Sequence, residues 1–555
     1  MATIVEKRDG QTIYRSPDTI DIPNVDLLTF LFDLPNERLR DDTILHVDAA
    51  DPSRSITKSR LVKAVKQLAH TLRHRYNIRN GDVVQVIFTG HYMAPVVFYG
   101  IMAAGGSVAS SSPSSSPSEV ARQINLTESK MVICSPDIKA LAVTGGTSAG
   151  LPDDCILYIG DSQEFQLFEA KSDKQLSLSG EELDWERVTD RTNLENTVGC
   201  FIYSSGTTGM PKAVKISHAN MIAQALCITT PTIKYYHKDG PGMKFITLGH
   251  LPAAHISGLQ AYIVNQTYMG GVVYWMKKFN FVDFIENIKK YKVNYMFSVP
   301  PIYLMIAKSP LVKDHLDSVD FALTGGAALG RETQVEAQKK MGRGKALLAQ
   351  TWGLSETTAG FTLLPRHLTD DTGSVSMIVA NCEARLVDDE GRDVEVGQPG
   401  EMLCRGPIIT KGYYKNDKAN QEAFVDGWFC TGDRLLFKDG KFYFVDRKKE
   451  LIKYKGIQVA PAELEALLVT HPKIQDAAVI GVDGEGTELP RAYVVADKTQ
   501  ISAEEIQKWV ADQVASYKKL RGGVVFIDAI PKSPSGKILR KDLRALVKRE
   551  AGAKL

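Results

Sequence analysis

Apolar and polar positions alternate between a helical spacing and a strand pattern in the first part of the chain. A helix is predicted to open at Ile56-Thr57-Lys58-Ser59, because the next apolar positions fall on one helical face: Leu61, Val65, Leu68 and Leu72. Gly81-Asp82 then leads into Val83 to Phe88, a continuous apolar run typical of a strand buried on both faces. This alternation predicts an α/β fold with a mainly parallel sheet.

The pattern changes near residue 447. Downstream, Pro461 stands at a predicted helix start with Glu463 in its first turn, and Ser502-x-x-Glu505 is a capping box that opens another helix. These signals indicate a compact α+β unit. The chain of 555 residues is also longer than one hydrophobic core usually serves. We therefore predict two domains, 1–447 and 448–555.

Composition and charge exclude several classes of protein. The formal net charge is only +2, which gives no reason to expect a nucleic-acid partner. The seven cysteines form no Cys-x-x-Cys pair, so a zinc-site spacing is absent. No signal peptide or membrane span is recognised. The chain ends Ala553-Lys554-Leu555, one residue away from the Ser-Lys-Leu peroxisomal signal. We expect a peroxisomal location through the import receptor, and otherwise a cytoplasmic one.

The most specific motif runs from Tyr203 to Lys212, with the sequence YSSGTTGMPK. It offers backbone N–H groups, small hydroxyls and one cation, which are the groups that bind a polyphosphate. It is not a Walker loop, because Pro211 precedes the lysine and Ala213 follows it. The segment from Ala213 to Ile216 is predicted to be a strand, so the loop joins two strands.

This loop resembles the phosphate loop of the adenylate-forming superfamily, which includes acyl-CoA synthetases, 4-coumarate–CoA ligases, peptide-synthetase adenylation domains and beetle luciferases. The resemblance extends from about Ile56 to Lys541, and the segment Asp446 to Glu465 is similar to the hinge of the 4-coumarate–CoA ligase and luciferase branch. It implies a large N-terminal multi-layer α/β domain and a small mobile C-terminal α+β lid, with the active site between them. It also implies an acid–CoA ligase that uses ATP, Mg²⁺ and coenzyme A.

The resemblance assigns a nucleotide site to four segments. Trp352 replaces the usual Tyr and could stack on adenine. Asp433 would accept hydrogen bonds from the ribose, and Glu356 would be the Mg²⁺ ligand. The implied ATP/AMP-binding residues are Ser204, Ser205, Gly206, Thr207, Thr208, Lys212, Ala327, Gln350, Trp352, Gly353, Ser355, Asp433 and Arg447.

Other motifs assign the chemistry and the acid site. Lys537 would contact both the carboxylate and the α-phosphate, and His255 would lie beside the carboxylate. The hinge string implies Lys449 as the pivot and Lys453 and Gln458 as further catalytic residues. The implied CoA-binding residues are Lys278, Lys455 and Gly456. The implied acyl pocket is lined by small residues, with room for an aryl or a medium- or long-chain acid: Ser257, Ala261, Gly325, Ala359 and Gly360.

Three alternatives remain at this stage. An amino-acid adenylation domain is disfavoured, because the acidic partner for its substrate ammonium follows an aromatic residue where this chain has His255-Ile256. A luciferase-like oxygenase shares the adenylation step, and a non-catalytic nucleotide- or CoA-binding protein belongs to a different class. The particular acid stays open. Plant 4-coumarate–CoA ligases have a Tyr where this chain has Ser257, so a hydroxycinnamate does not follow from the resemblance.

Overall fold

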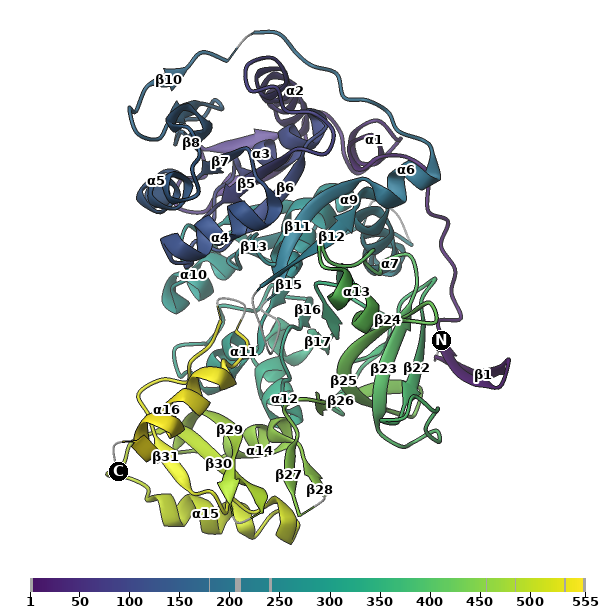
Figure 1. Cartoon of the computed structure of the whole chain (residues 1–555), viewed down its shortest axis with the longest axis vertical. Helices are drawn as coiled ribbons and strands as arrows, with labels where there is room; N and C mark the ends of the chain where they lie inside the picture. The colour runs from purple at the N-terminus through teal and green to yellow at the C-terminus, as the bar shows by residue number, and fades with distance from the viewer. Residues whose placement is uncertain are drawn as a thin grey trace.

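A computed structural model describes residues 3–178, 180–204, 211–238, 242–455, 457–484, 486–533 and 536–552. A large N-terminal body is followed by a small C-terminal unit, which is seen in yellow and lime at the lower left of Figure 1. Both are mixtures of helices and strands, as the sequence predicts. Within the described ranges, none of the helices combines the length and apolar character that crossing a bilayer requires.

An eight-stranded sheet with the order β10-β9-β8-β7-β5-β6-β11-β12 forms one layer of the body. Its central strands β8, β7, β5, β6 and β11 are parallel. The strand bounds are β5 (Val83–Ile87), β6 (Ser107–Ser111), β7 (Met131–Cys134), β8 (Ile156–Ile159), β9 (Leu167–Glu169), β10 (Gln175–Leu176), β11 (Val198–Ser204) and β12 (Lys212–Ser217). The predicted buried strand is β5, all of whose residues are buried.

Helices cover both faces of this sheet. Ile133 of β7 joins the core that contains α2 and α3, whereas its neighbours Val132 and Cys134 join the core that contains α4 and α5. Successive strand residues therefore point to opposite faces, as the pleat requires. The helix bounds are α2 (Lys58–His74), α3 (Ala94–Ala103), α4 (Pro117–Thr127) and α5 (Lys139–Ser148). The α2 helix confirms the one predicted at 56–59, and Thr57 is its N-cap.

Two smaller sheets lie beside it. Asn294, just before the second of these sheets, forms two hydrogen bonds with Ile246 of the first. Its side-chain oxygen accepts from Ile246 N at 2.9 Å, and its backbone N–H donates to Ile246 O at 3.1 Å. The first sheet contains β13 (Ile246–Gly249), β14 (Val272–Trp275), β3 (Ile44–Asp48) and β4 (Ser55–Thr57); the second contains β15 (Tyr295–Ser298), β16 (Phe321–Thr324) and β17 (Leu347–Gln350). The carboxyl ends of β16 and β17 lead into the glycine-rich turn and the Trp352 segment.

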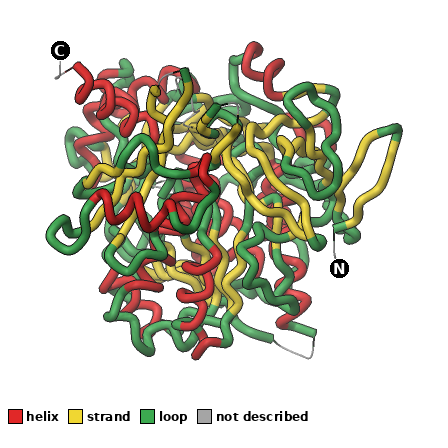
Figure 2. The backbone as a smooth tube through the Cα atoms, turned by 90° about the horizontal axis from the view of Figure 1, so that it is seen from below, coloured by secondary structure: helices red, strands yellow, loops and turns green. Residues whose placement is uncertain are grey.

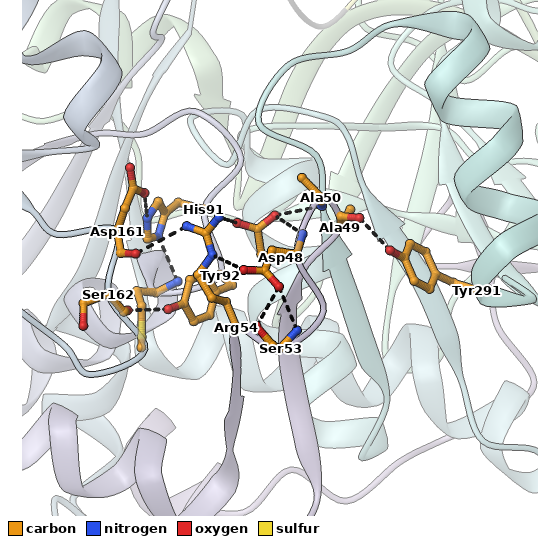
Figure 3. A network of polar contacts seen from close by, with 12 residues as sticks. Asp48, Ala49, Ala50, Ser53, Arg54, His91, Tyr92, Asp161, Ser162 and Tyr291 are labelled. Carbon is orange, nitrogen blue, oxygen red and sulfur yellow. Dashed lines mark hydrogen bonds and ion pairs between the residues drawn. The ribbon is translucent and has the colours of Figure 1, made fainter.

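A polar network ties the β3–β4 sheet to the large sheet (Figure 3). Arg54 reaches Asp48 Oδ2 at 3.5 Å and donates to the backbone oxygen of Asp161 at 3.3 Å. His91 Nε2 lies 3.1 Å from Asp161 Oδ1. Because Asp161 follows β8 while Asp48 ends β3, the network fixes the two sheets against each other.

The remaining helices of the body surround these sheets. Ser217 caps α7 through a capping box with Asn220. A seven-residue π-helix, η3 (Leu259–Asn265), continues α8. The helix bounds are α1 (Leu27–Phe32), α6 (Arg191–Asn196), α7 (His218–Tyr236), α8 (Ile256–Gly258), α9 (Gln266–Met269), α10 (Phe281–Tyr291), α11 (Pro300–Lys308), α12 (Arg331–Lys339) and α13 (Asp417–Ala423).

An antiparallel sheet closes the body next to the C-terminal unit. Its β1–β2 hairpin projects from the body at the right of Figures 1 and 2. The bounds are β1 (Ile4–Arg8), β2 (Gln11–Arg15), β22 (Glu383–Val387), β23 (Gly400–Arg405), β24 (Phe424–Val425), β25 (Trp428–Lys438) and β26 (Lys441–Arg447). Two short two-stranded sheets come before β22 in the chain. They are β18 (Gly353–Leu354) with β19 (Ala359–Gly360), and β20 (Thr362–Leu363) with β21 (Met377–Ile378).

The C-terminal unit, called the lid below, has its own hydrophobic core. The predicted helix start at Pro461 and the capping box of Ser502 with Glu505 are confirmed. The bounds are β27 (Ile452–Tyr454), β28 (Ile457–Val459), α14 (Pro461–Leu468), β29 (Ile474–Gly484), β30 (Thr487–Ala496), α15 (Ala503–Ala511), β31 (Val524–Phe526) and α16 (Arg540–Gly552).

Hydrogen bonds join the lid to the body at separate points. Ala462 N, at the start of α14, donates to Asp446 Oδ2 at 2.9 Å. Lys308 of α11 donates to the backbone oxygen of Ile474, and Arg434 of β25 donates to the side chain of Gln458. In each of these bonds a charged side chain of the body meets a backbone or neutral group of the lid.

One sequence-based boundary needs correction. The serine- and proline-rich run from Ser110 to Ser118 is typical of a loop, and from this run alone we predict that the next helix begins at Glu119. In the structure, β6 extends to Ser111 and α4 begins at Pro117, with Ser116 as its N-cap. Proline is well placed at the first position of a helix, where its missing N–H would have had no partner.

Candidate active site

Two pockets meet at Lys537. Pocket A contains about 830 Å³ of space between atoms, part of it open to solvent, and its wall includes residues of both the body and the lid. Pocket B contains about 740 Å³ and is built from the body, with Lys537 as the lid's contribution. The residues that line both pockets are Gly326, Thr351, Gly353, Leu354 and Lys537. A group bound in one pocket would therefore meet a group bound in the other at Lys537.

Pocket A offers an indole ring next to a carboxylate. Trp352 follows β17, is buried, and donates from Nε1 to Asp433 Oδ2 at 2.9 Å. Its ring meets Phe361 edge-on, with centroids 5.8 Å apart. A flat apolar ring beside a carboxylate can take a base and the hydroxyls of its sugar. This arrangement suits a nucleoside.

Asp433 is a buried carboxylate between cations. It lies opposite Arg447 in the β25–β26 pairing, and Arg447 Nε is 3.7 Å from Asp433 Oδ1. Burial raises the pKa of Asp433, while Arg447 and the hydrogen bond from Trp352 oppose that rise. Hydrogen bonds from ribose hydroxyls would further stabilise the ionised form.

The phosphate loop connects the paired strands β11 and β12, and Tyr413 links these strands to Glu356. Ser204 at the end of β11 pairs with Lys212 at the start of β12. The Lys212 ammonium lies 4.6 Å from the centroid of the Tyr413 ring, and Tyr413 donates from its hydroxyl to Glu356 Oε1 at 2.9 Å. Burial, and then the neighbouring Glu356, raises the pKa of Tyr413, so the phenol stays protonated. Tyr413 thus connects the stem of the loop to the predicted metal ligand.

His255 has a defined proton position. The backbone N–H of Ser257 donates to His255 Nδ1 at 3.3 Å, and Ser257 Oγ lies 2.7 Å from the same nitrogen. Because a backbone N–H can only donate, Nδ1 is an acceptor and the neutral ring carries its proton on Nε2. Burial and the charge of Lys537 lower the pKa of His255 to about 3. The ring is therefore neutral at physiological pH and can donate one hydrogen bond.

Lys537 is held on a tight turn between the two pockets. Its backbone oxygen accepts from Ser533 N at 2.8 Å, its N–H donates to Ser533 Oγ at 3.1 Å, and Gly536 has a φ of 80°. Burial and the charge of Arg447 lower the pKa of Lys537 to about 8, although Glu356 and Asp433 favour the charged form. A bound polyphosphate would add negative charge and raise this pKa.

The structure brings together most of the predicted nucleotide and acid residues that it describes. Ala327, Trp352, Gly353, Asp433, Arg447 and Lys537 line pocket A. His255, Ser257, Ala261, Gly325, Ala359 and Gly360 line pocket B, again with Gly353 and Lys537. At Gly353 a side chain would not fit, since a Cβ there would lie 1.9 Å from Ala359 O.

Gln350 and Ser355 line neither pocket, although both are buried. The Gln350 amide donates to Leu329 O at 3.0 Å and to Gln334 Oε1 at 2.8 Å. Its side chain therefore holds the glycine-rich turn against α12. Gln350 therefore has a supporting contact, and its nucleotide contact stays a prediction.

The predicted CoA and hinge residues lie away from both pockets. Lys453, Lys455 and Gln458 are exposed on the β27–β28 hairpin, and Lys278 and Lys449 are exposed as well. The docked lid thus presents Lys537 to the pockets and keeps the hairpin outside. The predicted residues Ser205, Gly206, Thr207, Thr208 and Gly456, and the tail Ala553-Lys554-Leu555, lie outside the described residues.

Sequence reasoning missed two groups of residues. From the lid side, pocket A is lined by Glu465 and Arg540, which form a two-point ion pair at 2.7 and 2.8 Å, and Asp446 of β26 lines it from the body. Pocket B includes three carboxamides: Gln224, Gln260 and Asn265. The acidic and basic lid residues belong to the recognised motif strings, which gave a usable signal, whereas the carboxamides lie in helical segments without a motif.

Glu356 fits a magnesium ion. Its carboxylate is buried, accepts one hydrogen bond, and acts electrostatically on both Asp433 and Lys537, which line pocket A, so it lies near that pocket without lining it. Among the residues that the structure describes, no cluster of three or more His, Cys, Asp and Glu could hold a metal by itself. Mg²⁺ bound by one or two carboxylates takes its other ligands from phosphates and water. Glu356 would hold such an ion, which would neutralise phosphate charge.

Replacing Trp352 by Phe should raise the KM for ATP about threefold to tenfold, because Asp433 loses its indole donor, a bond worth about 0.5–1.5 kcal/mol, and the smaller ring stacks less. Steady-state kinetics at saturating acid and CoA measure this. Trp428→Phe is the control, since Trp428 is equally buried but lines neither pocket. An unchanged KM for Trp352→Phe would place this residue in the core alone.

Comparison with known proteins agrees with this geometry. The family model "AMP-binding enzyme" matches residues 33–414, and the model of its C-terminal domain matches residues 463–537. The chain belongs to the AMP-binding enzyme family.

Individual relatives are similar over nearly their whole length. A putative acyl-coenzyme A synthetase of Emericella nidulans is 42% identical over 545 residues, covering 96% of this chain and 98% of the relative. A phenylacetyl-CoA ligase of Aspergillus niger is 34% identical over 541 residues, covering 95% and 98%. The fold is similar to that of ATP-bound MatB from Rhodopseudomonas palustris, with a TM-score of 0.80, 23% identity and coverage of 94% and 99%.

Proposed function

We propose that this protein is an ATP-dependent acid–CoA ligase. It converts a carboxylic acid and ATP to an acyl-adenylate and pyrophosphate, and then transfers the acyl group to coenzyme A with release of AMP. The observation that carries the proposal is the position of Lys537, which lines both pocket A, with its indole ring and buried carboxylate, and pocket B. The relatives named as CoA ligases support the thioester-forming second step.

In the first step the acid lies in pocket B with its carboxylate next to Lys537 and His255. A carboxylate oxygen attacks the α-phosphorus, and the bond to the β-phosphate oxygen breaks. Both reactants are anionic, so their approach is repulsive. Lys537 offsets this repulsion and stabilises the charge that develops on phosphorus. His255 donates from Nε2 and orients the carboxylate, while Trp352 and Asp433 hold the nucleoside.

In the second step the thiol sulfur of CoA attacks the acyl carbon and AMP leaves. A thiol with a pKa near 8.5 is a few per cent ionised at neutral pH, so its proton can pass to solvent. The exposed hairpin with Lys453, Lys455 and Gln458 serves this step after the lid has rotated about Lys449. The small residues of pocket B leave room for an aryl or an extended acyl group.

An acid panel tests the proposal directly. Purified protein with ATP, Mg²⁺ and CoA should form AMP, pyrophosphate and an acyl-CoA thioester from at least one aryl or acyl acid, as detected by mass spectrometry. Pyrophosphate without thioester would overturn the CoA step, and light emission with luciferin would favour the oxygenase alternative. Absence of pyrophosphate with every acid would favour a non-catalytic binding protein.

The proposal extends to the peroxisome, on the ground of the terminal Ala553-Lys554-Leu555. A fluorescent protein fused to the N-terminus should give a punctate pattern that coincides with a peroxisomal marker. Deletion of the three residues should make the signal diffuse. A pattern that does not change on deletion would contradict import through this tripeptide.

A further inference from the structure

Tyr413 is held by its backbone between β12 and the segment that carries Glu356. It forms an antiparallel bridge with Val214, in the middle of β12. Its own N–H donates to Asn420 Oδ1 at 2.7 Å. Three residues earlier, Thr410 N donates to Glu356 O at 2.8 Å. The backbone at this position therefore has contacts that do not involve the phenol side chain.

The Tyr413 side chain lies between two opposite charges of the nucleotide site. The Lys212 ammonium lies over its ring, 4.6 Å from the centroid, and its hydroxyl donates to Glu356 Oε1 at 2.9 Å. The tyrosine and the glutamate are 7% and 9% exposed. In the part of the chain that the structure describes, no direct ion pair joins Lys212 to Glu356, and both charges contact the same phenol.

The phenol also determines which oxygen of Glu356 is occupied. An ionised carboxylate can only accept, so Tyr413 is the donor in this bond. Among the described residues it is the one donor that reaches this carboxylate, and it reaches Oε1. Oε2 thus remains for a metal ion, in an orientation set by the bond to Oε1.

A direct ion pair between Lys212 and Glu356 would compete with both ligands of the site. A lysine ammonium is a compact charge on a flexible four-carbon stem, so Lys212 could turn to Glu356 if the ring were absent. The ammonium would then be withdrawn from the phosphates, and the carboxylate from Mg²⁺. A flat side chain that holds the cation on its face and the anion at its hydroxyl prevents this neutralisation.

We propose that Tyr413 is a positioning residue of the nucleotide site: its ring keeps the Lys212 ammonium available for phosphate, and its hydroxyl keeps Glu356 oriented for Mg²⁺. This inference rests on the nucleotide step of the proposed function. Tyr413 itself lines neither pocket and takes no part in bond formation.

Tyr413→Phe tests the hydroxyl. Calorimetry measures the dissociation constant of a non-hydrolysable ATP analogue with Mg²⁺ and again with EDTA, and Mg²⁺ should tighten binding to the unaltered protein. In Tyr413→Phe this tightening should shrink about tenfold, the usual loss when a group that orients a metal ligand is removed. The constant in EDTA should not change, because the ring still holds Lys212. Full tightening by Mg²⁺ in this variant, or equal weakening under both conditions, would overturn the proposal.

Tyr413→Leu tests the ring. Lys212 and Glu356 can then pair directly, so analogue binding in EDTA should weaken about tenfold, because one charge-assisted contact must break first. Adding Glu356→Gln to the same chain removes the competing carboxylate and should restore binding in EDTA to the value of Glu356→Gln alone. A loss that this second change does not restore would mean damage to the fold and would refute the role of the ring. Tyr413→Phe keeps the test open if Tyr413→Leu does not fold.

Tyr414→Phe is the matched control, since it removes the neighbouring phenol, whose ring contacts Phe201 and Lys415 and lines neither pocket. It should leave both dissociation constants unchanged. A loss of Mg²⁺ tightening as large as in Tyr413→Phe would contradict a specific contact with Glu356. Failure of the unaltered protein to bind the analogue at all would instead count against the ligase function, and this inference would fall with it.

Discussion

Replacing Lys537 by Ala should slow acyl-adenylate formation by roughly 10²–10³, the usual loss for one preorganised electrostatic contact. The ammonium is the lid group that lines both pockets, so its charge acts where carboxylate and phosphate approach. Conversion of supplied acyl-AMP and CoA to thioester should stay nearly normal. Stopped-flow detection of pyrophosphate and a thioester assay with preformed acyl-AMP separate the two steps.

Lys541→Ala is the matched control, because Lys541 is exposed on α16 and lines neither pocket. It should leave both steps unchanged. The pH dependence gives a second measurement: the pKa of Lys537 is lowered to about 8, and its charged form is the active one. For the free protein, kcat/KM for ATP should therefore fall as pH rises above about 8. A profile that is flat to pH 10 would contradict the role of the Lys537 charge.

Replacing Lys449 by Pro should spare the first step and slow thioester formation about 100-fold. The described residues include no acceptor for the Lys449 N–H, so proline removes no hydrogen bond there. Lys449 is the third residue of the turn closed by the 2.9 Å bond from Glu450 N to Arg447 O, and proline at this position restricts Lys448 as well, so the expected effect is confined to the pivot. Rotation of the lid changes backbone angles at the pivot, and the proline ring resists that change.

Lys449→Ala is the control for this experiment, since it removes the side chain and keeps the backbone free. Both half-reactions should then proceed at nearly normal rates. Equal loss of both half-reactions in a folded Lys449→Pro protein would mean that the pivot lies elsewhere. Loss in Lys449→Ala would show that the ammonium itself matters.

Local patterns were sufficient for much of the fold. The helix at Lys58, the buried strand at Val83 and the helix start at Pro461 depend on spacing and capping within a few residues, and all three are confirmed. The phosphate loop was predicted to join two strands, and β11 and β12 do pair antiparallel on either side of it. Each of these features is set by contacts that are close in sequence.

The missed site residues depend on distant contacts. Arg540 and Glu465 are 75 positions apart, so their ion pair is invisible to local pattern. The lining role of Gln260 depends on η3, whose five-residue spacing is not part of the 3.6-residue pattern by which helices are recognised. Gln350 lies in a motif that the sequence did reveal. Its side-chain amide is nevertheless hydrogen-bonded to Leu329 and Gln334, which the motif does not predict.

The ion pair between Arg540 and Glu465 lowers the free-energy cost of moving the lid away from the body. Both charges travel with the lid, so undocking leaves neither of them buried without its partner. Asp446 loses the hydrogen bond from Ala462 but keeps that from Arg447 N, at 2.7 Å. Each such bond contributes only about 0.5–1.5 kcal/mol net. The lid rotation proposed above would therefore break few strong contacts, and we expect the bound nucleotide or thiol to determine which lid position is populated.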